Sequence, residues 1–569
     1  MQNKIRCAFI LSAGYGNRLR PLTDILPKPL VPIRGKTPLE LVFDKLIAAG
    51  VSKFIVNIHH LRREFDAKLA ALRRPDGRFF YNGAEIFLSY EDKILDTGGG
   101  IKHARKLLMD EEAILVHNAD ILFSAPARRF IGRAAKAIFD EGKAAVLCLR
   151  DSGSNMNVGV RRQCVCDMRH KLGNPAERNL QFTGFFAAGR GFLEECFNAK
   201  GDVFSTVDII LKLIARDAQS VGFYAENSGS FSDIGTPAEY LKACGRHSDT
   251  FMGMLAKLKC LGFEPSSPSL IDKGASARKF VRFTDARDGR KLVACFYPKA
   301  KREDALYARI AKFLLSNKID VPKTALADAR RRIFVMGDGG NLDLLTLVRT
   351  APEKAERFYE MAVENALRLH TTATQKFLGH PFEISQSFDS GLYDWEHNYF
   401  KQECMRAKFS AEPDEKFEAQ LRELKATLLS QPQVLLHRDF QSQNIIVGEN
   451  SISIIDFQGM RMGCAMYDLA SLLYDPYADI SDSLRKRLLR LYFGRAPDDS
   501  ELKLFYLAAS QRLLQALGAY GFLSIKKGKP EYAKFFAPAL ERLIVCSGNA
   551  GLKSVQETAL KLRAKLPLQ

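Results

Sequence analysis

Glycines and cations that could handle a polyphosphate are concentrated near the start of the sequence. Residues 11–33 read LSAGYGNRLRPLTDILPKPLVPI, in which Gly14 and Gly16 let the backbone approach phosphate groups and donate amide hydrogen bonds. Arg18 can pair with phosphate oxygens in a forked, charge-assisted geometry. Lys28 lies between two prolines that stiffen its backbone, and its charge suits a phosphorus centre on which negative charge develops. The string as a whole predicts a site for a nucleoside triphosphate.

A second set of chemical groups lies in the C-terminal half of the sequence. Residues 434–458 read VLLHRDFQSQNIIVGENSISIIDFQ, an apolar strand followed by Asp439, then Asn444, then a second apolar strand that ends at Asp456. This order and spacing are typical of kinase-like phosphotransferases. In such a site Asp439 orients or deprotonates the acceptor hydroxyl, and Asn444 and Asp456 hold Mg²⁺.

The elements that must position the first set alternate between strands and helices. Strands are expected at 7–12, 53–58 and 113–117, with helices at 38–49 and 101–108. Such β–α–β alternation predicts an α/β domain with a mainly parallel sheet and helices on both faces. Ligands of these sheets bind at the carboxyl ends of the strands.

A break in the sequence separates two regions. The loop at 262–268, GFEPSSP, is rich in residues that interrupt helices and strands, and it follows a helix-like stretch at 251–261. Strand-like segments at 279–283 and 291–296 come next, and helical patterns dominate from about residue 352. We therefore expect a first domain at 1–245, a linker at 246–267 and a second domain at 268–569.

The positive charge of the chain is spread over both regions. Residues 1–245 carry 35 Lys and Arg against 27 Asp and Glu, and the remaining residues carry 49 against 38, which together give the net charge of +19. A diffuse basic surface suits enzymes that handle phosphorylated anions better than a nucleic-acid partner, which would favour a concentrated patch. We expect small-molecule substrates and no nucleic acid.

The sequence also bears on location. No apolar stretch approaches the ~20 residues that span a bilayer, and the apolar run at 7–12 is too short for the core of a signal peptide. The eleven cysteines form no C-x-x-C pair, which favours reduced thiols. We expect a cytoplasmic protein with no membrane partner.

The N-terminal string resembles the signature of sugar-1-phosphate nucleotidyltransferases, and the resemblance continues to about residue 245. It implies a Rossmann-like domain in which Ala13, Gly14 and Gly16 bind the nucleotide. It also makes Arg18 and Lys28 the catalytic cations.

Further motifs extend this resemblance. Asp120 follows an apolar strand where the family carries its first magnesium-binding aspartate, although Ala119 replaces the usual glycine. The segment SDIGTP resembles the motif of the second aspartate, Asp233, although Phe231 replaces the usual tryptophan. Two carboxylates suit Mg²⁺, which takes its other ligands from water and phosphates. The resemblance also implies substrate contacts from the motifs DTGGGI and FTG, which supply Gly98, Gly99, Thr183 and Gly184.

The C-terminal region resembles aminoglycoside phosphotransferase and choline kinase-like enzymes over residues 268–545, and within them the anomeric kinases of cell-wall amino sugars. The motif D-F-Q at Asp456 and the continuation YDLASLL carry this resemblance. It implies a two-lobed, kinase-like α+β domain. Ser276, in a phosphate loop reading GASAR, and Asp338, at the hinge between lobes, would bind the nucleotide.

One departure from the kinase pattern concerns the ATP site. The strand at 291–296 reads KLVACF and has no lysine where most kinases place the one that pairs the α- and β-phosphates. Three alternatives remain, namely Lys279, Lys299, or Ser276 with nearby amides.

A fusion of these two activities suggests consecutive reactions. Since a nucleotidyltransferase of this type needs a sugar 1-phosphate, the kinase would phosphorylate an anomeric hydroxyl first. The resemblances imply N-acetylmuramate or N-acetylglucosamine as the sugar, ATP and UTP as the nucleotides, and Mg²⁺ as the cofactor, in peptidoglycan salvage. Two alternatives are a choline kinase joined to a phosphocholine cytidylyltransferase and a nucleic-acid-binding or scaffold protein with degenerate enzyme folds. The intact site residues disfavour the scaffold.

Overall fold

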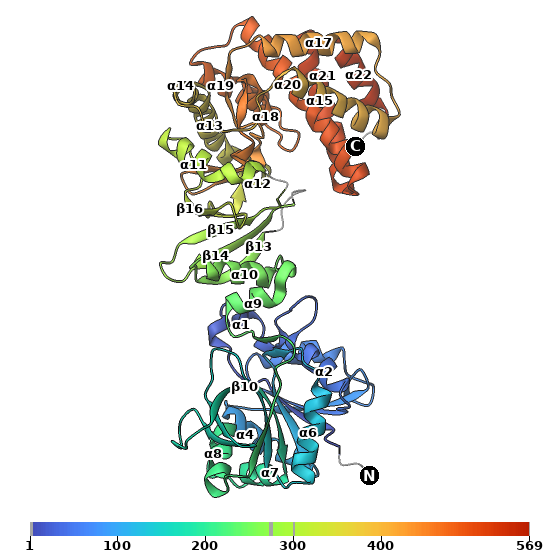
Figure 1. Cartoon of the computed structure of the whole chain (residues 1–569). Coiled ribbons are helices and arrows are strands. Elements are labelled where there is room, and N and C mark those ends of the chain that lie inside the picture. The colour runs from blue at the N-terminus through green and yellow to red at the C-terminus, as the bar shows by residue number, and fades with distance from the viewer. Residues whose placement is uncertain (1–3, 272–276, 300–301, 568–569) are drawn as a thin grey trace. The chain divides into compact units, whose positions relative to one another are not determined.

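The computed structural model describes residues 4–271, 277–299 and 302–567 and divides into two compact units, Met1–Ser266 and Ser267–Gln569 (Figure 1). Much of the segment expected to be a linker is helix α10 (Phe251–Cys260), which belongs to the first unit and packs against α9 (Pro237–Cys244). The first unit ends at Ser266, next to the predicted end of the linker at residue 267. Within the described residues, no helix is long and apolar enough to cross a membrane.

A mixed β-sheet forms the centre of the first unit. β1 (Cys7–Leu11) pairs in parallel with β2 (Lys53–Ile58) on one side and with β5 (Ala113–Asn118) on the other, and β2 pairs in parallel with β4 (Ala84–Tyr90). These strands confirm the predicted β–α–β alternation. The strand order among the described residues is β3-β4-β2-β1-β5-β10-β7-β11-β9-β8, in which β3 is Phe79–Tyr81 and β11 is Val221–Ala225.

The other half of the sheet departs from the predicted parallel arrangement. β10 (Arg178–Gly189) runs antiparallel to both of its long neighbours, β5 and β7 (Ala145–Arg150). The hairpin of β8 (Val158–Arg161) and β9 (Cys164–Met168) comes directly before β10, and this fully described stretch contains no crossover helix. Parallel neighbours need a crossover of a dozen or more residues, whereas antiparallel ones accept short connections. The chain thus reaches β10 from β7 through residues 151–177, a hairpin and its loops, and not through the crossover helix that a parallel neighbour would use.

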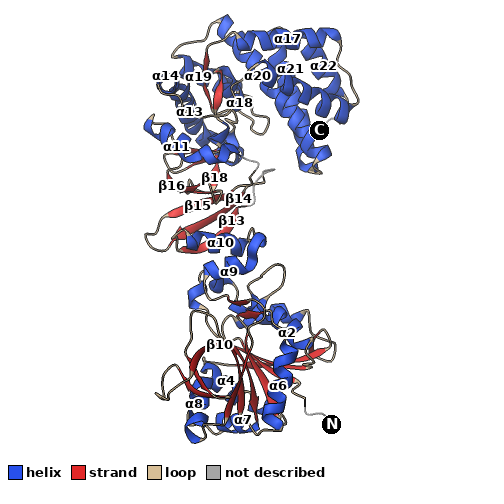
Figure 2. Cartoon of the chain, in the orientation of Figure 1, coloured by secondary structure: helices blue, strands red, loops and turns tan. Residues whose placement is uncertain are grey.

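Helices cover both faces of the sheet, as expected (Figure 2). Because side chains alternate along a strand, Ala8 and Ile10 belong to one buried cluster and Cys7 and Phe9 to another. The first cluster includes side chains of α2 (Pro38–Ile47), α3 (Arg62–Ala70) and α6 (Ala127–Phe139), and the second those of α4 (Asp96–His103), α7 (Arg190–Phe197) and α8 (Thr206–Arg216).

A small two-stranded sheet brings distant parts of the first unit together. β6 (Ile121–Phe123) pairs antiparallel with β12 (Phe231–Asp233), and Asp233 lies opposite Ile121 in the register. The backbone N–H of Ile234 also donates to the carbonyl of Asp120 at 3.2 Å. This pairing places the two predicted metal-binding aspartates side by side.

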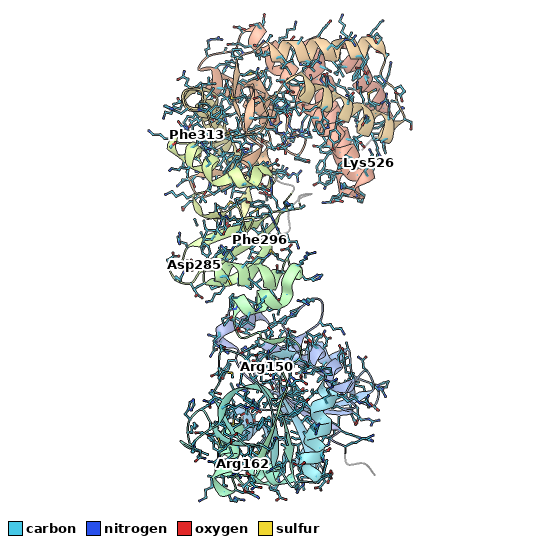
Figure 3. The ribbon with its side chains drawn as sticks, viewed as in Figure 1. Arg150, Arg162, Asp285, Phe296, Phe313 and Lys526 are labelled. Carbon is cyan, nitrogen blue, oxygen red and sulfur yellow. The ribbon has the colours of Figure 1, made fainter. Side chains whose placement is uncertain are left out.

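The second unit begins with a five-stranded sheet, in which the pairings β14–β15, β15–β17 and β17–β16 are antiparallel. The order is β13-β14-β15-β17-β16, and α11 (Tyr307–Ser316) follows β15 in the chain. Figure 3 labels Phe296 at the end of β15. The strands are β13 (Pro265–Ile271), β14 (Lys279–Asp285), β15 (Lys291–Phe296), β16 (Thr324–Asp328) and β17 (Ile333–Gly337).

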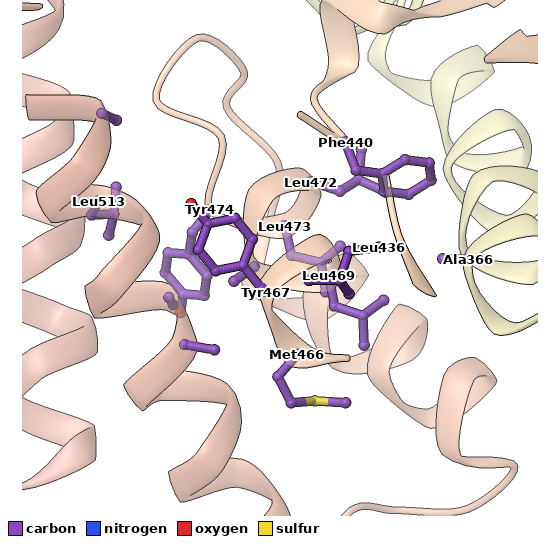
Figure 4. Close-up of a cluster of buried hydrophobic side chains, with 14 of the residues drawn as sticks. Ala366, Leu436, Phe440, Met466, Tyr467, Leu469, Leu472, Leu473, Tyr474 and Leu513 are labelled. Carbon is purple, nitrogen blue, oxygen red and sulfur yellow. The ribbon is translucent and has the colours of Figure 1, made fainter. Parts of the chain in front are cut away.

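The rest of the second unit is mostly helical, so this unit is a mixed α+β structure as expected. Two short sheets, β18-β20-β21 and β19-β22, carry the predicted catalytic segment. Buried apolar side chains hold this segment in place, and Leu436 and Phe440 lie on either side of residues 437–439 (Figure 4). Strand bounds are β18 (Leu342–Asp343), β19 (Gln433–Leu436), β20 (Ile445–Val447), β21 (Ile452–Ile454) and β22 (Arg461–Cys464), and the main helices are α12 (Leu344–Thr350), α13 (Pro352–Arg368), α15 (Ser390–Tyr399), α17 (Glu415–Leu429), α18 (Met466–Leu473), α19 (Asp482–Phe493), α20 (Asp499–Gly521), α21 (Phe536–Ala550) and α22 (Lys553–Ala564).

Candidate active sites

A cavity of about 400 Å³ lies at the carboxyl end of β1 in the first unit. Its wall combines the glycine loop after β1 with residues that follow β2, β4 and β5, as the strand-end rule anticipates. The structure therefore brings together most of the first predicted site. The predicted residues that line it are Ala13, Gly14, Gly16, Arg18, Lys28 and Asp120.

The glycine loop has a specific conformation. Gly16 has φ +66°, and a Cβ added there would lie 2.7 Å from Cγ2 of Thr23. The hydroxyl of Thr23 donates to the carbonyl of Gly16 at 3.0 Å and fixes the turn. A Cβ added at Gly14 would meet no atom within 4 Å, so this part of the loop borders open space. Gly16 is thus required by the turn, and Gly14 leaves room for a ligand to approach the backbone.

Lys28 lines this cavity, and its Nζ lies between two carboxylates. Its Nζ donates a hydrogen bond to Oδ2 of Asp120 and lies 3.6 Å from Oδ1 of Asp233. Nη2 of Arg18 lies 3.8 Å from Oδ2 of Asp233. The two predicted catalytic cations and the two predicted metal-binding aspartates therefore form one group.

The two aspartates are suited to a divalent cation. Oδ1 of Asp233 is buried and makes no hydrogen bond within the described structure. Burial raises the pKa of Asp233, with Lys28 opposing this effect and the charge of Asp120 adding to it. Mg²⁺ prefers one or two carboxylates together with phosphate oxygens. An unsatisfied carboxylate oxygen next to a second carboxylate fits this requirement.

Two buried polar residues of the cavity were not anticipated from the sequence. Oδ1 of Asn57 accepts the backbone N–H of Ser12 at 2.6 Å, and its Nδ2 donates to Oε1 of Glu91 at 2.7 Å. Burial raises the pKa of Glu91. Both residues lie at carboxyl ends of strands and line the cavity, so they fix its floor. In the sequence, a polar Asn57 near the end of the mostly apolar strand KFIVNI could have indicated a residue of the cavity.

Four residues expected to contact the substrate do not line this cavity. The amides of Gly98 and Gly99 both donate to the carbonyl of Phe204, at 2.9 and 3.1 Å, so these groups are already engaged. A Cβ added at Gly99 would lie 2.0 Å from the carbonyl oxygen of Asp202. Close packing against residues 202–204 thus explains the glycines, while the neighbouring Asp96 and Thr97 line the cavity.

The strand motif FTG also has a packing role. The Thr183 side chain is fully buried and donates to the carbonyl of Cys148 at 2.8 Å. Gly184 has φ +70°, and a Cβ added there would lie 2.3 Å from Ile121 and 2.9 Å from Nδ2 of Asn118. Because Asn118 lines the cavity, Gly184 lies behind its wall. These contacts do not bring either residue into the cavity.

In the second unit, the loop after β19 presents Asp439. The buried carboxylate of Asp468 holds this loop by accepting the backbone N–H groups of His437 and Arg438 at 2.6 and 2.8 Å. His370 Nε2 lies 3.3 Å from the same carboxylate. Burial acts to raise the pKa of Asp439, but the charges of Arg438 and Arg512 outweigh it and the pKa is lowered. Asp439 is therefore held as a carboxylate.

Asn444 and Asp456 are held close to this loop. Nδ2 of Asn444 donates to the carbonyl of Asp439 at 2.8 Å, which leaves the amide oxygen for another ligand. The backbone N–H of Ile455 donates to the carbonyl of Asn444 at 2.9 Å. Burial raises the pKa of Asp456, and Arg278 opposes this effect. An amide oxygen and a carboxylate are oxygen donors of the kind Mg²⁺ takes.

Arg278 is a candidate for the role of the lysine that is absent from β15. Its Nη1 lies 2.8 Å from Oδ1 of Asp456, and its Nη2 and Nε lie 2.7 and 3.0 Å from the two carboxylate oxygens of Asp304. Asp304 is 1% exposed and precedes α11. A buried acid thus holds a cation at the predicted metal ligand. No local pattern in the sequence indicates this pair, because Arg278 and Asp304 are 26 positions apart.

The other predicted nucleotide contacts are less direct. Oδ1 of Asp338 accepts hydrogen bonds from Nη2 of Arg282 and from the backbone N–H of Gly340, both at 3.0 Å, so its carboxylate orders the turn after β17. Ser276 lies outside the described residues. Lys279 and Lys299 are exposed.

Two family models match the chain, one in each unit. Residues 7–160 match the model described as Nucleotidyl transferase, and residues 268–505 match the model described as Phosphotransferase enzyme family.

Curated relatives also match the two units separately. The chain is 37% identical over 138 residues, 24% of its length, to N-acetylmuramate alpha-1-phosphate uridylyltransferase of Caulobacter vibrioides, of which it covers 54%. It is 28% identical over 268 residues, 45% of its length, to mannose-1-phosphate guanyltransferase of Aspergillus fumigatus, covering 68% of that protein. It is 24% identical over 271 residues, 45% of its length, to N-acetylmuramate/N-acetylglucosamine kinase of C. vibrioides, covering 74% of that protein.

Proposed function

The chain joins a nucleotidyl transferase domain to a phosphotransferase domain, and we propose that they catalyse consecutive reactions on one amino sugar. The second unit transfers the γ-phosphoryl group of ATP to the anomeric hydroxyl of N-acetylmuramate or N-acetylglucosamine. The first unit then transfers the uridylyl group of UTP to the resulting sugar 1-phosphate. The products are ADP, pyrophosphate and a UDP-sugar, which suits a place in the salvage of cell-wall sugars.

The observation that carries this proposal is the pairing of the two relatives. One is named as a uridylyltransferase of N-acetylmuramate α-1-phosphate and the other as a kinase of N-acetylmuramate and N-acetylglucosamine. Phosphorylation at the anomeric hydroxyl supplies the 1-phosphate that nucleotidyl transfer consumes. A chain that holds both kinds of domain is therefore suited to make and use this intermediate.

The phosphotransferase site has groups for each part of its reaction. Asp439 accepts the proton of the acceptor hydroxyl as the hydroxyl oxygen attacks the γ-phosphorus and the bond to the ADP oxygen breaks. Arg278, held by Asp304, supplies positive charge to the phosphate groups of ATP. Asn444 and Asp456 would hold Mg²⁺, which when bound offsets negative charge on the phosphate oxygens.

The nucleotidyl transfer site has a different set of groups. A phosphate oxygen of the sugar 1-phosphate attacks the α-phosphorus of UTP, and the bond to pyrophosphate breaks. The glycine loop supplies backbone amides, and Arg18 and Lys28 stabilise the charge that develops. Asp120 and Asp233 would hold Mg²⁺. Nζ of Lys28 contacts both carboxylates. Because the metal would take its place there, the Lys28 side chain would turn toward the phosphate groups when the carboxylates bind the metal.

The choline alternative fits the second unit less well. Arg438, Arg461 and Arg512 all act on the charge of Asp439. A cationic acceptor would be repelled by three guanidinium groups, and choline sites generally use aromatic cages instead.

The test is a coupled reaction with the purified chain. Incubation with ATP, UTP, Mg²⁺ and N-acetylmuramate should yield the UDP-sugar, detected by mass spectrometry. Omitting ATP should stop the reaction, and supplying the sugar 1-phosphate should restore it. If no amino sugar gave a UDP-sugar, the proposal would be wrong. Turnover of choline with ATP and CTP would establish the choline kinase alternative. Replacing UTP by GTP in the same assay tests which nucleotide base the first unit accepts.

A further inference from the structure

Two arginines, Arg438 and Arg461, lie near Asp439 and bring their side chains together. A Cβ added at Gly459 would lie 3.7 Å from Nη1 of Arg438, and Nε of Arg461 donates to the carbonyl of Gly459 at 3.2 Å. Both arginines therefore reach the same glycine, from β22 and from the catalytic loop. Arg438 has φ +79°, a conformation that favours glycine. A non-glycine residue kept in such a conformation at a reactive site suggests a use for its side chain.

The charges of these arginines are only partly balanced within the described structure. The nearest carboxylate oxygen to Arg438 is that of Asp439, at 3.9 Å, and no carboxylate in the described residues lies within 4.0 Å of Arg461. Arg461 is 8% exposed, and its guanidinium also lies over the ring of Phe388, 5.6 Å from the centroid. Buried charges are normally paired. Asp439 also pairs with Arg512, so its single charge cannot balance all the neighbouring guanidinium groups, and the excess positive charge suits an anion.

A third arginine is differently engaged. Nε of Arg512 donates to the hydroxyl of Ser471 at 3.1 Å, and Nη1 donates to Gln515. Its Nη2 lies 3.7 Å from Oδ1 of Asp439. Arg512 thus has hydrogen-bond partners and fixes the carboxylate, whereas the terminal nitrogens of Arg438 and Arg461 remain for a ligand.

The groups around the arginine pair differ from those around Asp456. Burial lowers the pKa of Arg461, as does the charge of Arg438, while Asp439 and Glu396 oppose this effect. Glu396 is fully buried on α15 and is satisfied by Tyr467 and Gln511, at 3.1 and 2.9 Å. The cation that contacts Asp456 is instead Arg278. Asp456, the predicted metal ligand, and Arg278 mark the nucleotide side of the phosphotransferase site. The arginine pair is therefore assigned to the side of the acceptor sugar.

We propose that Arg438 and Arg461 bind the carboxylate of an acidic acceptor sugar and so favour N-acetylmuramate over N-acetylglucosamine in the phosphotransferase reaction. This inference rests on the proposed function. The forked guanidinium group matches a carboxylate in a two-point geometry, and the burial of Arg461 beside the ring of Phe388 strengthens the pairing. The neutral sugar lacks the carboxylate and gains nothing from the pair. Both arginines act in binding and selectivity, and Asp439 remains the group that takes the proton.

The test compares the two sugars in steady-state phosphorylation. Arg461→Met keeps the length and apolar contacts of the side chain but removes its charge. It should raise the ratio of the KM for N-acetylmuramate to that for N-acetylglucosamine by about tenfold or more, the loss typical of a charge-assisted hydrogen bond. Arg461→Lys keeps the charge and should restore part of the preference. Arg438→Gln, at a side chain 27% exposed, should shift the ratio in the same direction with less risk to folding.

The control is Arg406→Met, because Arg406 is an exposed arginine paired with Glu412 at 2.8 Å and should not alter the ratio. Equal losses of kcat for both sugars would overturn the inference and assign the pair to the transferred phosphoryl group. An unchanged ratio in both Arg461→Met and Arg438→Gln would also overturn it. Failure of the unmodified chain to phosphorylate either sugar would instead show that the proposed function is wrong, together with the inference built on it.

Discussion

Nη1 of Arg278 lies 2.8 Å from Oδ1 of Asp456, across 178 positions of sequence. The first residue precedes β14 and the second follows β21, so the contact joins the sheet of the second unit to its catalytic segment. Asp304 fixes the guanidinium from the other side. Under the proposed function, Arg278 would supply the positive charge beside the nucleotide's phosphates that the lysine absent from β15 supplies in most kinases.

Replacing Arg278 should therefore disable the phosphotransferase selectively. We expect Arg278→Met to lower kcat/KM for ATP by roughly 10²–10³, the usual cost of removing one preorganised electrostatic group. Nucleotidyl transfer from supplied sugar 1-phosphate should persist. ADP release and pyrophosphate release measure the two reactions. Arg290→Met, an exposed arginine paired with Asp288, is the control. Full phosphotransferase activity in Arg278→Met would return the role to Lys279, Lys299 or Ser276.

The two sites should also be separable through their aspartates. Asp439→Asn removes the proton acceptor and should lower phosphorylation by roughly 10²–10⁴, the range for general bases, while leaving uridylyl transfer intact. Asp120→Asn should have the reverse effect, because Asp120 and Lys28 belong only to the first site. Separate assays with sugar and ATP, and with sugar 1-phosphate and UTP, give the result. Loss of both reactions in either variant would contradict two independent sites.

Much of both sites could be predicted because their chemistry lies in short segments. The stretch from Ala13 to Lys28 carries its own turn residues, and Asp439 and Asn444 are five positions apart. The conformation of such a short segment depends mostly on the residues within it. Asp120 and Asp233 were predicted from motifs at strand ends, and the pairing of β6 with β12 brings them together.

What could not be predicted depends on tertiary contacts. A glycine required by packing and a glycine required by a ligand have the same sequence signal, so Gly98 and Gly99 were expected at the substrate. Their amides instead bond Phe204, more than a hundred positions away. The reversed β10 and the Arg278–Asp456 contact arise in the same way, from neighbours that no local pattern specifies.

The carboxylate of Asp468 should be essential to the shape of the catalytic loop. Asp468→Asn replaces one acceptor oxygen by an amide that opposes a backbone N–H, so at least one buried donor at residues 437–438 loses its partner. We expect a loss of roughly 2–4 kcal/mol in the free energy of unfolding of the second unit, together with much lower phosphorylation. Urea unfolding measures the first effect. Asp479→Asn, at a side chain 99% exposed, should change neither. An unchanged unfolding midpoint in Asp468→Asn would show that the loop is held by other contacts.

Lys45 on α2 should destabilise the first unit near neutral pH. Its Nζ lies 4.8 and 5.5 Å from the ring centroids of Phe123 and Phe185, beside a cavity of about 630 Å³, and no described carboxylate lies within 4.0 Å. Burial lowers the pKa of Lys45 to about 8 from 10.5. Below pH 8 both folded and unfolded chains hold the proton, so the cost of the buried charge is fully present. Between pH 8 and 10.5 the unfolded chain binds more protons, and stability therefore rises with pH.

Lys45→Met removes the charge and keeps the shape of the side chain. At pH 7 it should stabilise the first unit by up to about 3 kcal/mol, since one pKa unit corresponds to about 1.4 kcal/mol. The gain should shrink as the pH rises from 8 to 10.5, because the unmodified chain then loses the buried charge. Thermal unfolding across this range measures both effects. Lys36→Met, at an exposed lysine that pairs with Asp44 at 2.6 Å, should show no such convergence. Parallel stability curves for Lys45→Met and the unmodified chain would mean that Lys45 keeps an ordinary pKa in the folded protein.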